Sequence, residues 1–353
     1  MKITTRCGER AISELNEALI AKAVEARVLK TDRVRADTTV IEANVAYPSD
    51  SSLLAKGVAK IVKVARKVQG QGLATRTTVT DRTRSVRSRA RSIGANLRRR
   101  TDEKLVEVHR INRELVRIAR RSIREAEAVI RNARRGIAQL GDRATGRQRA
   151  DVADLARTAE RVERIAAQTI QRISGTTPAG ATRVVSLHDP DARPIAKGRL
   201  GKPVEFGYKA QLVDNEDGVI IDHNIETGNP PDAPMLAPAI ERVARRAGRV
   251  PRAVTADRGY GEAAIENALH VIGVRHVALP RKGRPNASRR EIENRRAFKN
   301  MVRWRTGCEG RISCAKRDFG LARTRIDGLH GARTWCGHGI FNHNLVKIAG
   351  LFQ

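Results

Sequence analysis

The feature that most constrains the fold is a hydrophobic period that changes twice along the chain. Residues 33–43 and 204–225 alternate apolar and polar side chains, which is the two-residue period of β-strands. Between them, residues 53–175 carry apolar side chains at steps of three and four, which is the period of amphipathic helices. This order predicts a sheet-containing domain that a long helical segment interrupts.

The same pattern predicts where the parts of the chain begin and end. Residues 1–30 are expected to form an N-terminal helix, and residues 31–52 with 182–353 are expected to form an α/β core. Residues 53–175 are expected to be an all-helical insertion after the first strand. The glycines of residues 141–146 break the helical pattern, and the apolar steps then return, which predicts a long antiparallel helical hairpin.

The charge of the chain indicates a polyanionic partner. The formal net charge is +31, far more than solubility requires. Residues 76–149 contain 22 Lys and Arg against 8 Asp and Glu, a net of +14. A charged helix face is usually only solvated, but a face of one sign favours phosphate binding. This segment has no aromatic side chain for base stacking, so contact with the backbone of double-stranded DNA is the preferred hypothesis.

Several other classes of protein do not fit the sequence. The chain has no apolar run of about eighteen residues and no apolar signal-peptide core, so we expect no membrane partner. Residues 198–202 lack the spacing of a Walker loop, and no nucleotide cofactor is expected. The cysteines are too few for a disulfide framework and fit no common zinc site: Cys7, Cys308, Cys314 and Cys336. We expect a cytoplasmic, nucleoid-associated protein with free cysteines.

Asp257 follows a short strand and precedes a turn. Residues Ala253–Ala256 are apolar apart from Thr255, and helical spacing resumes at Glu262–Leu269. In an α/β unit, a carboxylate at the C-terminal end of a strand lies in the crevice where such folds bind ligands and metals. The alternative is that Asp257 only caps the turn or helix that follows it.

Asp37 lies in the middle of the first strand, on the face opposite the apolar side chains. A buried Asp in a strand is unusual unless it is paired or bound to a metal, whereas an edge strand would leave it in water. Without residues 53–175, the order of elements is βββ-α-β-α-β-α, that of a ribonuclease H-like domain with a mixed sheet flanked by helices. In that topology the first and fourth strands are neighbours, so Asp37 and Asp257 are expected to face each other.

A third carboxylate from a later helix completes the expected cluster. Glu309 is preferred over Glu291 and Glu293, which lie in a charged stretch typical of a solvated helix face. Three converging carboxylates repel one another unless divalent cations neutralise them, and oxygen ligands suit Mg²⁺ or Mn²⁺. Two such ions activate a water or a 3′-hydroxyl and stabilise the leaving oxygen in phosphoryl transfer.

Several short motifs lie around these acids: Ala36–Val40, Tyr47–Asp50, Lys202–Lys209 and Ala256–Tyr260. With them, the chain resembles bacterial insertion-sequence transposases of the DDE class, whose catalytic core is called the transposase DDE domain. The resemblance covers most of the chain outside the helical insertion. It implies a ribonuclease H-like core in which Asp37, Asp257 and Glu309 are the catalytic and metal-binding residues, with two Mg²⁺ or Mn²⁺ ions.

Around the third acid, many of these enzymes have Tyr, two residues, Arg, three residues, Glu, six residues and Lys. Arg305, Glu309 and Lys316 match that pattern, and Val302 replaces the Tyr. The resemblance implies that Arg305 and Lys316 hold phosphates near the site. Arg258 and Lys282 are further candidates for contact with DNA.

The resemblance implies an enzyme that cleaves DNA at the ends of its element and joins those ends to target DNA, acting as a homodimer on DNA. The alternative is a truncated or inactive DNA-binding relative that acts as a regulator. Only 36 residues precede Asp37, where such transposases usually carry a helical region for end recognition. A metal-dependent nuclease without strand transfer would use the same residues.

Overall fold

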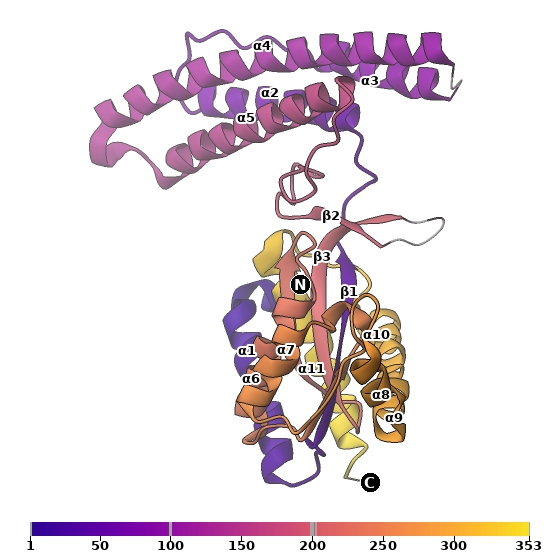
Figure 1. Ribbon diagram of the computed structural model, residues 1–353. Helices are drawn as coiled ribbons and strands as arrows, with labels where there is room; N and C mark the ends of the chain where they lie inside the picture. The colour runs from indigo at the N-terminus through magenta and orange to yellow at the C-terminus, as the bar shows by residue number, and fades with distance from the viewer. Residues whose placement is uncertain (1, 99–100, 198–200, 202, 353) are drawn as a thin grey trace. The chain divides into compact units, whose positions relative to one another are not determined.

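The computed structural model describes residues 2–98, 101–197, 201 and 203–352 (Figure 1). The chain divides into two compact units. The sheet unit comprises Met1–Asn44 and Asp191–Gln353, and the helical unit comprises Val45–Pro190. Most of residues 198–202, the segment without Walker spacing, lies outside the described residues.

The described residues of the sheet unit form a mixed sheet of six strands. They are β1 (Arg33–Glu42), β2 (Arg193–Ala196), β3 (Val204–Asn215), β4 (Ile220–Thr227), β5 (Ala253–Ala256) and β6 (His276–Ala278). β3 pairs antiparallel with β1 on one side and with β2 and β4 on the other, whereas β5 pairs parallel with β1 and with β6. The expected adjacency of the first strand and the strand before Asp257 is therefore confirmed.

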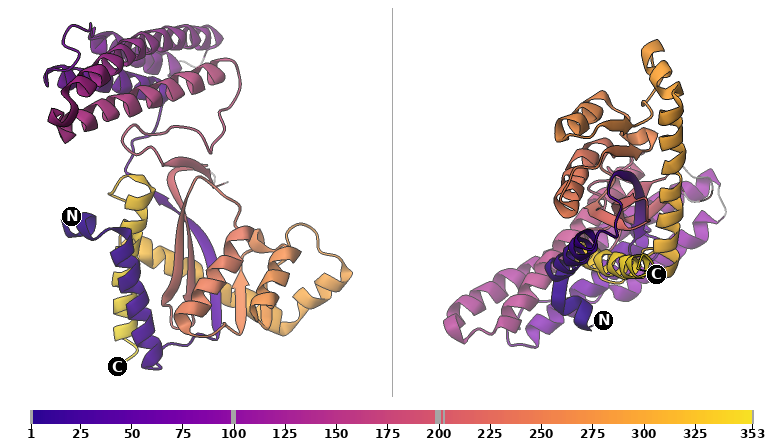
Figure 2. Two further views of the ribbon diagram at one scale, coloured as in Figure 1. Left: turned by 90° about the vertical axis from the view of Figure 1, so that its left-hand side faces the viewer. Right: turned by 90° about the horizontal axis from the view of Figure 1, so that it is seen from below.

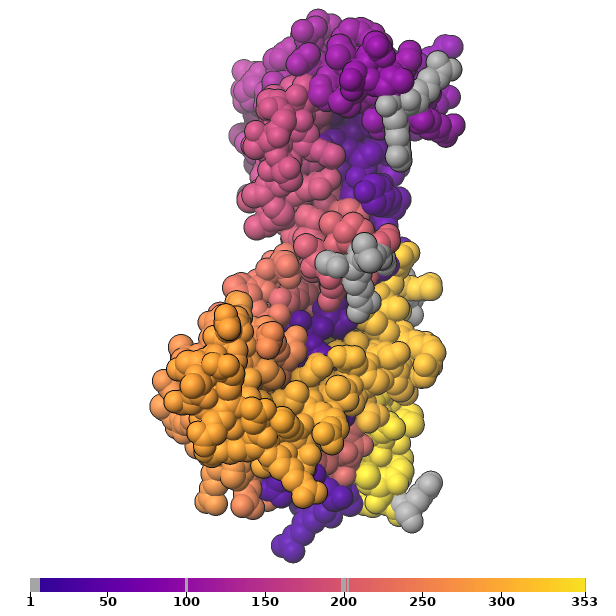
Figure 3. Space-filling model, turned by 45° about the vertical axis from the view of Figure 1, so that its right-hand side comes forward, coloured from indigo at the N-terminus to yellow at the C-terminus, as the bar shows by residue number. Residues whose placement is uncertain are grey.

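Helices cover both faces of this sheet. They are α1 (Lys2–Glu25), α6 (Ala233–Ala247), α7 (Ala263–Ile272), α8 (Ala287–Asn294), α9 (Arg296–Arg305), α10 (Gly307–Asp318) and α11 (Gly328–Ala349), with a 3₁₀ turn, η2, at Arg258–Tyr260. α1, α6 and α7 lie on one side of the sheet and α8, α9 and α10 on the other (Figure 1). α1 and α11 pack side by side (Figure 2). In the space-filling view, the orange surface that includes α8, α9 and α10 is continuous (Figure 3).

Strand alternation decides which side chains of β1 face which layer. Val34 and Ala36 are fully buried in a core with Val254 of β5 and Leu236 and Ile240 of α6. The side chains between them point to the opposite face, where α9 and α10 lie. A slip of one residue in register would turn Val34 and Ala36 toward α9 and α10. Burial of these two side chains therefore also fixes the direction in which Asp37 points.

The helical unit contains α2 (Asp50–Gln69), α3 (Thr83–Leu97), α4 (Asp102–Leu140), the turn η1 (Gly141–Arg143) and α5 (Gly146–Ile173). α4 and α5 pack together across η1 as the predicted hairpin, and α2 and α3 pack against it. The described residues of the unit thus form four α-helices, of which α3 was not expected from the sequence. Capping side chains explain the helix starts: Ser49, Thr101 and Thr145 each accept a hydrogen bond from a backbone N–H three residues on. None of the helices in the described part of the chain is long and apolar enough to cross a membrane.

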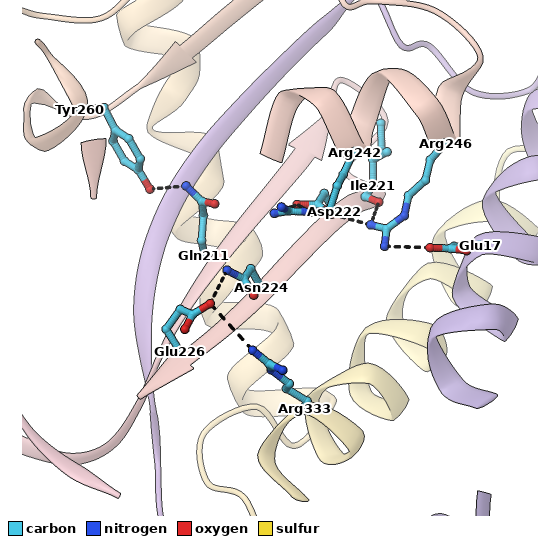
Figure 4. Close-up of polar contacts among 10 residues, drawn as sticks. All are labelled: Glu17, Gln211, Ile221, Asp222, Asn224, Glu226, Arg242, Arg246, Tyr260 and Arg333. Carbon is cyan, nitrogen blue, oxygen red and sulfur yellow. Dashed lines mark hydrogen bonds and ion pairs between the residues drawn. The ribbon is translucent and has the colours of Figure 1, made fainter. Parts of the chain in front are cut away.

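A buried ion-pair network ties β4 to α6 and α1 (Figure 4). Asp222 has no exposed surface and accepts hydrogen bonds from Arg242 Nη2 at 2.8 Å and Arg246 Nη1 at 2.5 Å. Arg246 also donates to the carbonyl of Ile221 at 3.0 Å and to Glu17 at 3.3 Å. The network links β4 to the helices because Asp222 would be a buried charge without a partner if Arg242 and Arg246 did not compensate it.

His223, next to this network, makes the stability of the fold sensitive to acid. Burial lowers the pKa of His223 from 6.5 to about 4, so the folded chain prefers the neutral imidazole. The neutral imidazole of His223 therefore contributes fully to the free energy of unfolding above pH 6.5. This contribution is lost as the pH falls toward 4, because the unfolded chain binds the proton more readily than the folded chain. A decrease in pKa of this size corresponds to about 3 kcal/mol, and because His223 as a residue is only partly buried, the expected effect is reduced to about 1–2 kcal/mol.

Urea unfolding near pH 7 and near pH 4.5 tests this prediction. His223→Gln is expected to lose less unfolding free energy between the two pH values than the wild-type chain, by about 1–2 kcal/mol. His276→Gln, at an exposed histidine, is the control and is expected to behave as wild type. Equal pH dependence in all three proteins would contradict the prediction.

Candidate active site

The pairing of β1 with β5 sets two aspartates next to each other. Ala36 pairs with Ala256, so the residues that follow, Asp37 and Asp257, lie side by side where β5 ends beside the middle of β1. Asp37 is 8 % exposed on an inner strand, which excludes a solvated Asp on an edge strand. Asp257 is half-buried, and it also caps η2 by accepting a hydrogen bond from the backbone N–H of Gly259 at 2.9 Å.

Arg305 connects this pair to the third predicted acid. It ends α9, and its guanidinium lies 3.2 Å from Asp37 Oδ2 through Nη1 and 3.1 Å from Glu309 Oε1 through Nη2. Glu309 is in the first turn of α10, four residues after Arg305, and its side chain is mostly exposed. The structure therefore brings Asp37, Arg305 and Glu309 together from a strand and two consecutive helices.

The carboxylates influence one another's protonation. The pKa of Asp37 is raised to about 6, mainly by burial. The charges of Asp257 and Glu309 contribute to this rise, whereas the hydrogen bond from the backbone N–H of Thr38 and the charge of Arg305 oppose it. Burial also raises the pKa of Asp257, and the charge of Asp232 adds to that effect. The site thus concentrates negative charge that one guanidinium only partly compensates, which is the condition that favours binding of a cation.

Asp232 and Lys209 lie in the same neighbourhood, although the sequence alone indicated no role for either residue, and Lys209 was named only as the end of the motif Lys202–Lys209. Asp232 precedes α6, and its Oδ1 lies 2.6 Å from Lys209 Nζ on β3. A Cβ on Gly259 would approach Asp257 Oδ1 to 3.0 Å and Asp232 Oδ2 to 3.1 Å, so this glycine separates the two carboxylates. Lys209, Asp232 and Lys282 line a pocket of about 300 Å³. In sequence, Asp232 is a common helix-start residue, and no local signal marked it.

Tyr260 helps to hold the turn that carries Asp257. Its ring is fully buried, and its hydroxyl accepts a hydrogen bond from Gln211 Nε2 of β3 at 3.1 Å (Figure 4). Burial raises the pKa of Tyr260, and the charges of Asp232, Asp37 and Asp257 raise it further. The neutral hydroxyl and the Gln211 amide thus anchor the turn that carries Asp257 to the sheet.

The other predicted DNA-contact residues lie around this centre. Arg258 is exposed in η2, directly after Asp257. Lys282 is exposed, with its Nζ 3.3 Å from Glu262 Oε1. Lys316 is half-buried in the last turn of α10, the helix that carries Glu309. Their roles in binding phosphate stay predictions.

The rival acids differ from Glu309 in their surroundings. Glu291 lies 3.9 Å from Arg295 on an exposed face, as predicted. The predicted solvated position of Glu293 is wrong, because Glu293 accepts hydrogen bonds from the backbone N–H of Arg281 at 2.7 Å and from Arg289 Nε at 2.9 Å. Glu293 therefore holds the loop before α8 in place, whereas only Glu309 of the three acts on the pKa of Asp37.

Among the residues that the structure describes, no group of three or more His, Cys, Asp or Glu is arranged to hold a metal ion. Arg305 lies between Asp37 and Glu309 and supplies the positive charge there. The adjacent carboxylates of Asp37 and Asp257 nevertheless offer only oxygen ligands, which is the donor set that Mg²⁺ and Mn²⁺ prefer.

A family model, described as the transposase DDE domain, matches residues 179–345. This region is a transposase DDE domain. It contains Asp257, Arg305 and Glu309, while Asp37 precedes it on a strand that pairs with the matched region. No curated protein and no solved structure matches the chain. DDE transposases act on DNA and generally use divalent metal ions, so the match supports a transposase-type function for this chain.

Proposed function

We propose that this protein is a DNA transposase that cleaves DNA at the ends of its insertion sequence and joins them to target DNA. The observation that carries the proposal is the register of β1 against β5, which sets Asp37 beside Asp257 in a chain that contains a transposase DDE domain. The strand order β4-β3-β1-β5-β6 supports a ribonuclease H-like core.

In this proposal, Asp37, Asp257 and Glu309 would hold two Mg²⁺ or Mn²⁺ ions. Such ions supply an activated water or 3′-hydroxyl and stabilise the leaving oxygen. Asp37 is positioned by an inner strand, and Asp257 by the hydrogen bond from the backbone of Gly259. Rigid placement matters because phosphoryl transfer depends mainly on the orientation of groups and on charge stabilisation.

Arg305 has two roles in the proposal. Its guanidinium pairs with both Asp37 and Glu309 and partly compensates their charge. With cations bound, the guanidinium is available for a phosphate of the DNA, to which it can donate two parallel hydrogen bonds. Lys316, Arg258 and Lys282 add positive charge along the path of the DNA strand.

The proposal predicts metal-dependent nicking and strand transfer on DNA that carries the element's own ends. Wild-type protein is expected to react with Mg²⁺ or Mn²⁺ and to stop when the metal is chelated. The triple variant Asp37→Asn, Asp257→Asn, Glu309→Gln is expected to lose both reactions and to keep salt-sensitive DNA binding. These substitutions remove charge and preserve shape, so the loss is not attributed to unfolding.

Cleavage by the triple variant at the wild-type rate would overturn the proposal. DNA binding without metal-dependent cleavage in either protein would point to the regulatory alternative. Cleavage without strand transfer in the wild-type protein would point to a nuclease.

A further inference from the structure

The solvent-facing side of α4 carries a long row of arginines. Their spacings of four, four, three, seven and four positions place them on one helix face, opposite the side chains of α4 that are buried in the helical unit. All six are exposed: Arg113, Arg117, Arg121, Arg124, Arg131 and Arg135. We refer to these six residues as the arginine row.

In the part of the chain that the structure describes, the arginine row has no acidic partners, unlike Arg110 and Arg120 of the same helix. Elsewhere on α4, Arg110 pairs with glutamates on its own helix, and Arg120 pairs with a glutamate of α5. Among the residues that the structure describes, no Asp or Glu forms an ion pair with any member of the row, and only Arg135 has a polar side-chain partner, Asn132. Like charges three or four positions apart destabilise a helix, so this arrangement costs stability in the free protein.

The length and shape of the row fit a nucleic-acid backbone. Arg113 and Arg135 are 22 positions apart, which at about 1.5 Å per residue is roughly 33 Å. One turn of B-form DNA is about 34 Å long. Guanidinium groups from successive turns of α4 can therefore meet phosphates along one turn of the duplex. Each guanidinium can bind a phosphate through two parallel N–H donors.

The chemistry of the helical unit favours duplex DNA over other anionic partners. The sequence has no Phe, Trp or Tyr between residues 48 and 205, so unpaired bases would find no aromatic platform. Most apolar side chains of α4 are buried against α2 and α5, and the exposed Leu105 and Val106 lie near its start, before the arginine row. The described part of α4 therefore offers no continuous apolar face along the row for insertion into a lipid surface.

We propose that the arginine row is a docking surface for the phosphate backbone of duplex DNA, outside the transposase DDE domain. The proposal rests on the proposed function in taking DNA as the substrate, but it does not depend on the catalytic residues. It assigns the helical unit a part in holding DNA, through contacts that are independent of base sequence.

The test compares two full-length variants that lose the same charge from the same unit. The row variant is Arg117→Gln, Arg121→Gln, Arg124→Gln. The control variant is Lys60→Gln, Arg157→Gln, Arg172→Gln, because these three side chains already pair with Asp154 or Asp50. Fluorescence anisotropy with a duplex of about 30 base pairs of arbitrary sequence gives the binding constant between about 50 and 200 mM salt.

The row variant is expected to reduce the slope of log K against log salt by roughly 2.7, which is about 0.9 for each phosphate that the protein no longer neutralises. The control variant is expected to change that slope by less than about 1. Equal reductions in the two variants would overturn the proposal, because a general electrostatic field would then explain the binding. A row variant that binds duplex DNA as the wild type does, and loses only RNA binding or self-association, would also overturn it.

Cleavage measured separately distinguishes this proposal from the proposed function. At low salt and saturating protein, the row variant is expected to retain metal-dependent nicking. The triple variant of the acidic residues is expected to show the opposite behaviour, with no cleavage and with the salt slope of the wild type. A wild-type protein that never cleaves DNA would refute the proposed function and leave the binding comparison valid.

Discussion

The substitution Asp257→Asn is expected to reduce the rate of metal-dependent DNA cleavage by at least about 1,000-fold. A metal ion contributes several kcal/mol of charge stabilisation to the transition state, and about 4 kcal/mol corresponds to this factor. The asparagine keeps the shape of the side chain and can still accept the hydrogen bond from the backbone of Gly259. The turn after β5 is therefore preserved while the negative charge is removed.

Single-turnover cleavage of labelled element-end DNA measures this effect. Asp327→Asn is a matched control, because Asp327 is an exposed aspartate before a helix in the same domain, and it is expected to cleave at the wild-type rate. Unfolding free energies of both variants check the fold. Removing the charge of Asp257 also removes its repulsion with Asp232, so no loss of stability is expected. Cleavage within about tenfold of wild type would contradict the assigned role.

The substitution Asp214→Ala is expected to lower the free energy of unfolding by about 3–5 kcal/mol, because it leaves a buried charge without its partner. Arg35 is 4 % exposed and donates to Asp214 through Nε at 2.8 Å and Nη2 at 2.7 Å. Arg35 Nη1 also donates to the carbonyl of Trp304 at 2.7 Å, and its guanidinium lies 4.6 Å from the centre of the Trp304 ring.

This ion pair also positions the candidate active site. Arg35 is two residues before Asp37 on β1, and Trp304 directly precedes Arg305 on α9. The pair thus holds the end of α9 against the sheet at the place where Arg305 meets Asp37. We therefore expect the Asp214→Ala variant to lose cleavage activity even at temperatures where it remains folded.

Chemical denaturation of the purified variants measures the stability effect. Glu216→Ala is the matched control, because Glu216 lies on the same hairpin and pairs with Arg33, whose side chain is about half exposed. A surface pair of this kind contributes about 0–1 kcal/mol. If Asp214→Ala lowered the free energy of unfolding by less than about 1 kcal/mol, the buried charge of Arg35 would not require Asp214 as its partner.

Local patterns were enough to place the predicted catalytic residues on their elements. The two-residue period of β1 put Asp37 on the face opposite the core, and the apolar run before Asp257 marked a strand end. The predicted neighbouring of these strands is confirmed. The helical period of residues 53–175 predicted the hairpin of α4 and α5 but did not resolve α3 as a further helix. These predictions succeed because a strand or helix that buries one face has apolar residues at a regular spacing in the sequence.

Other parts of the site depend on contacts between distant residues. Lys209 reaches Asp232 across the sheet, Glu293 fixes the backbone of Arg281, and Arg35 meets Asp214 from 179 positions away. No local period records such contacts, since a period shows that a side chain is buried and not which partner it meets. The sequence by itself determined most of the elements, α3 excepted, and the chemistry of their acids. Only the tertiary structure decided which charges compensate one another, because strand register and helix packing set those distances.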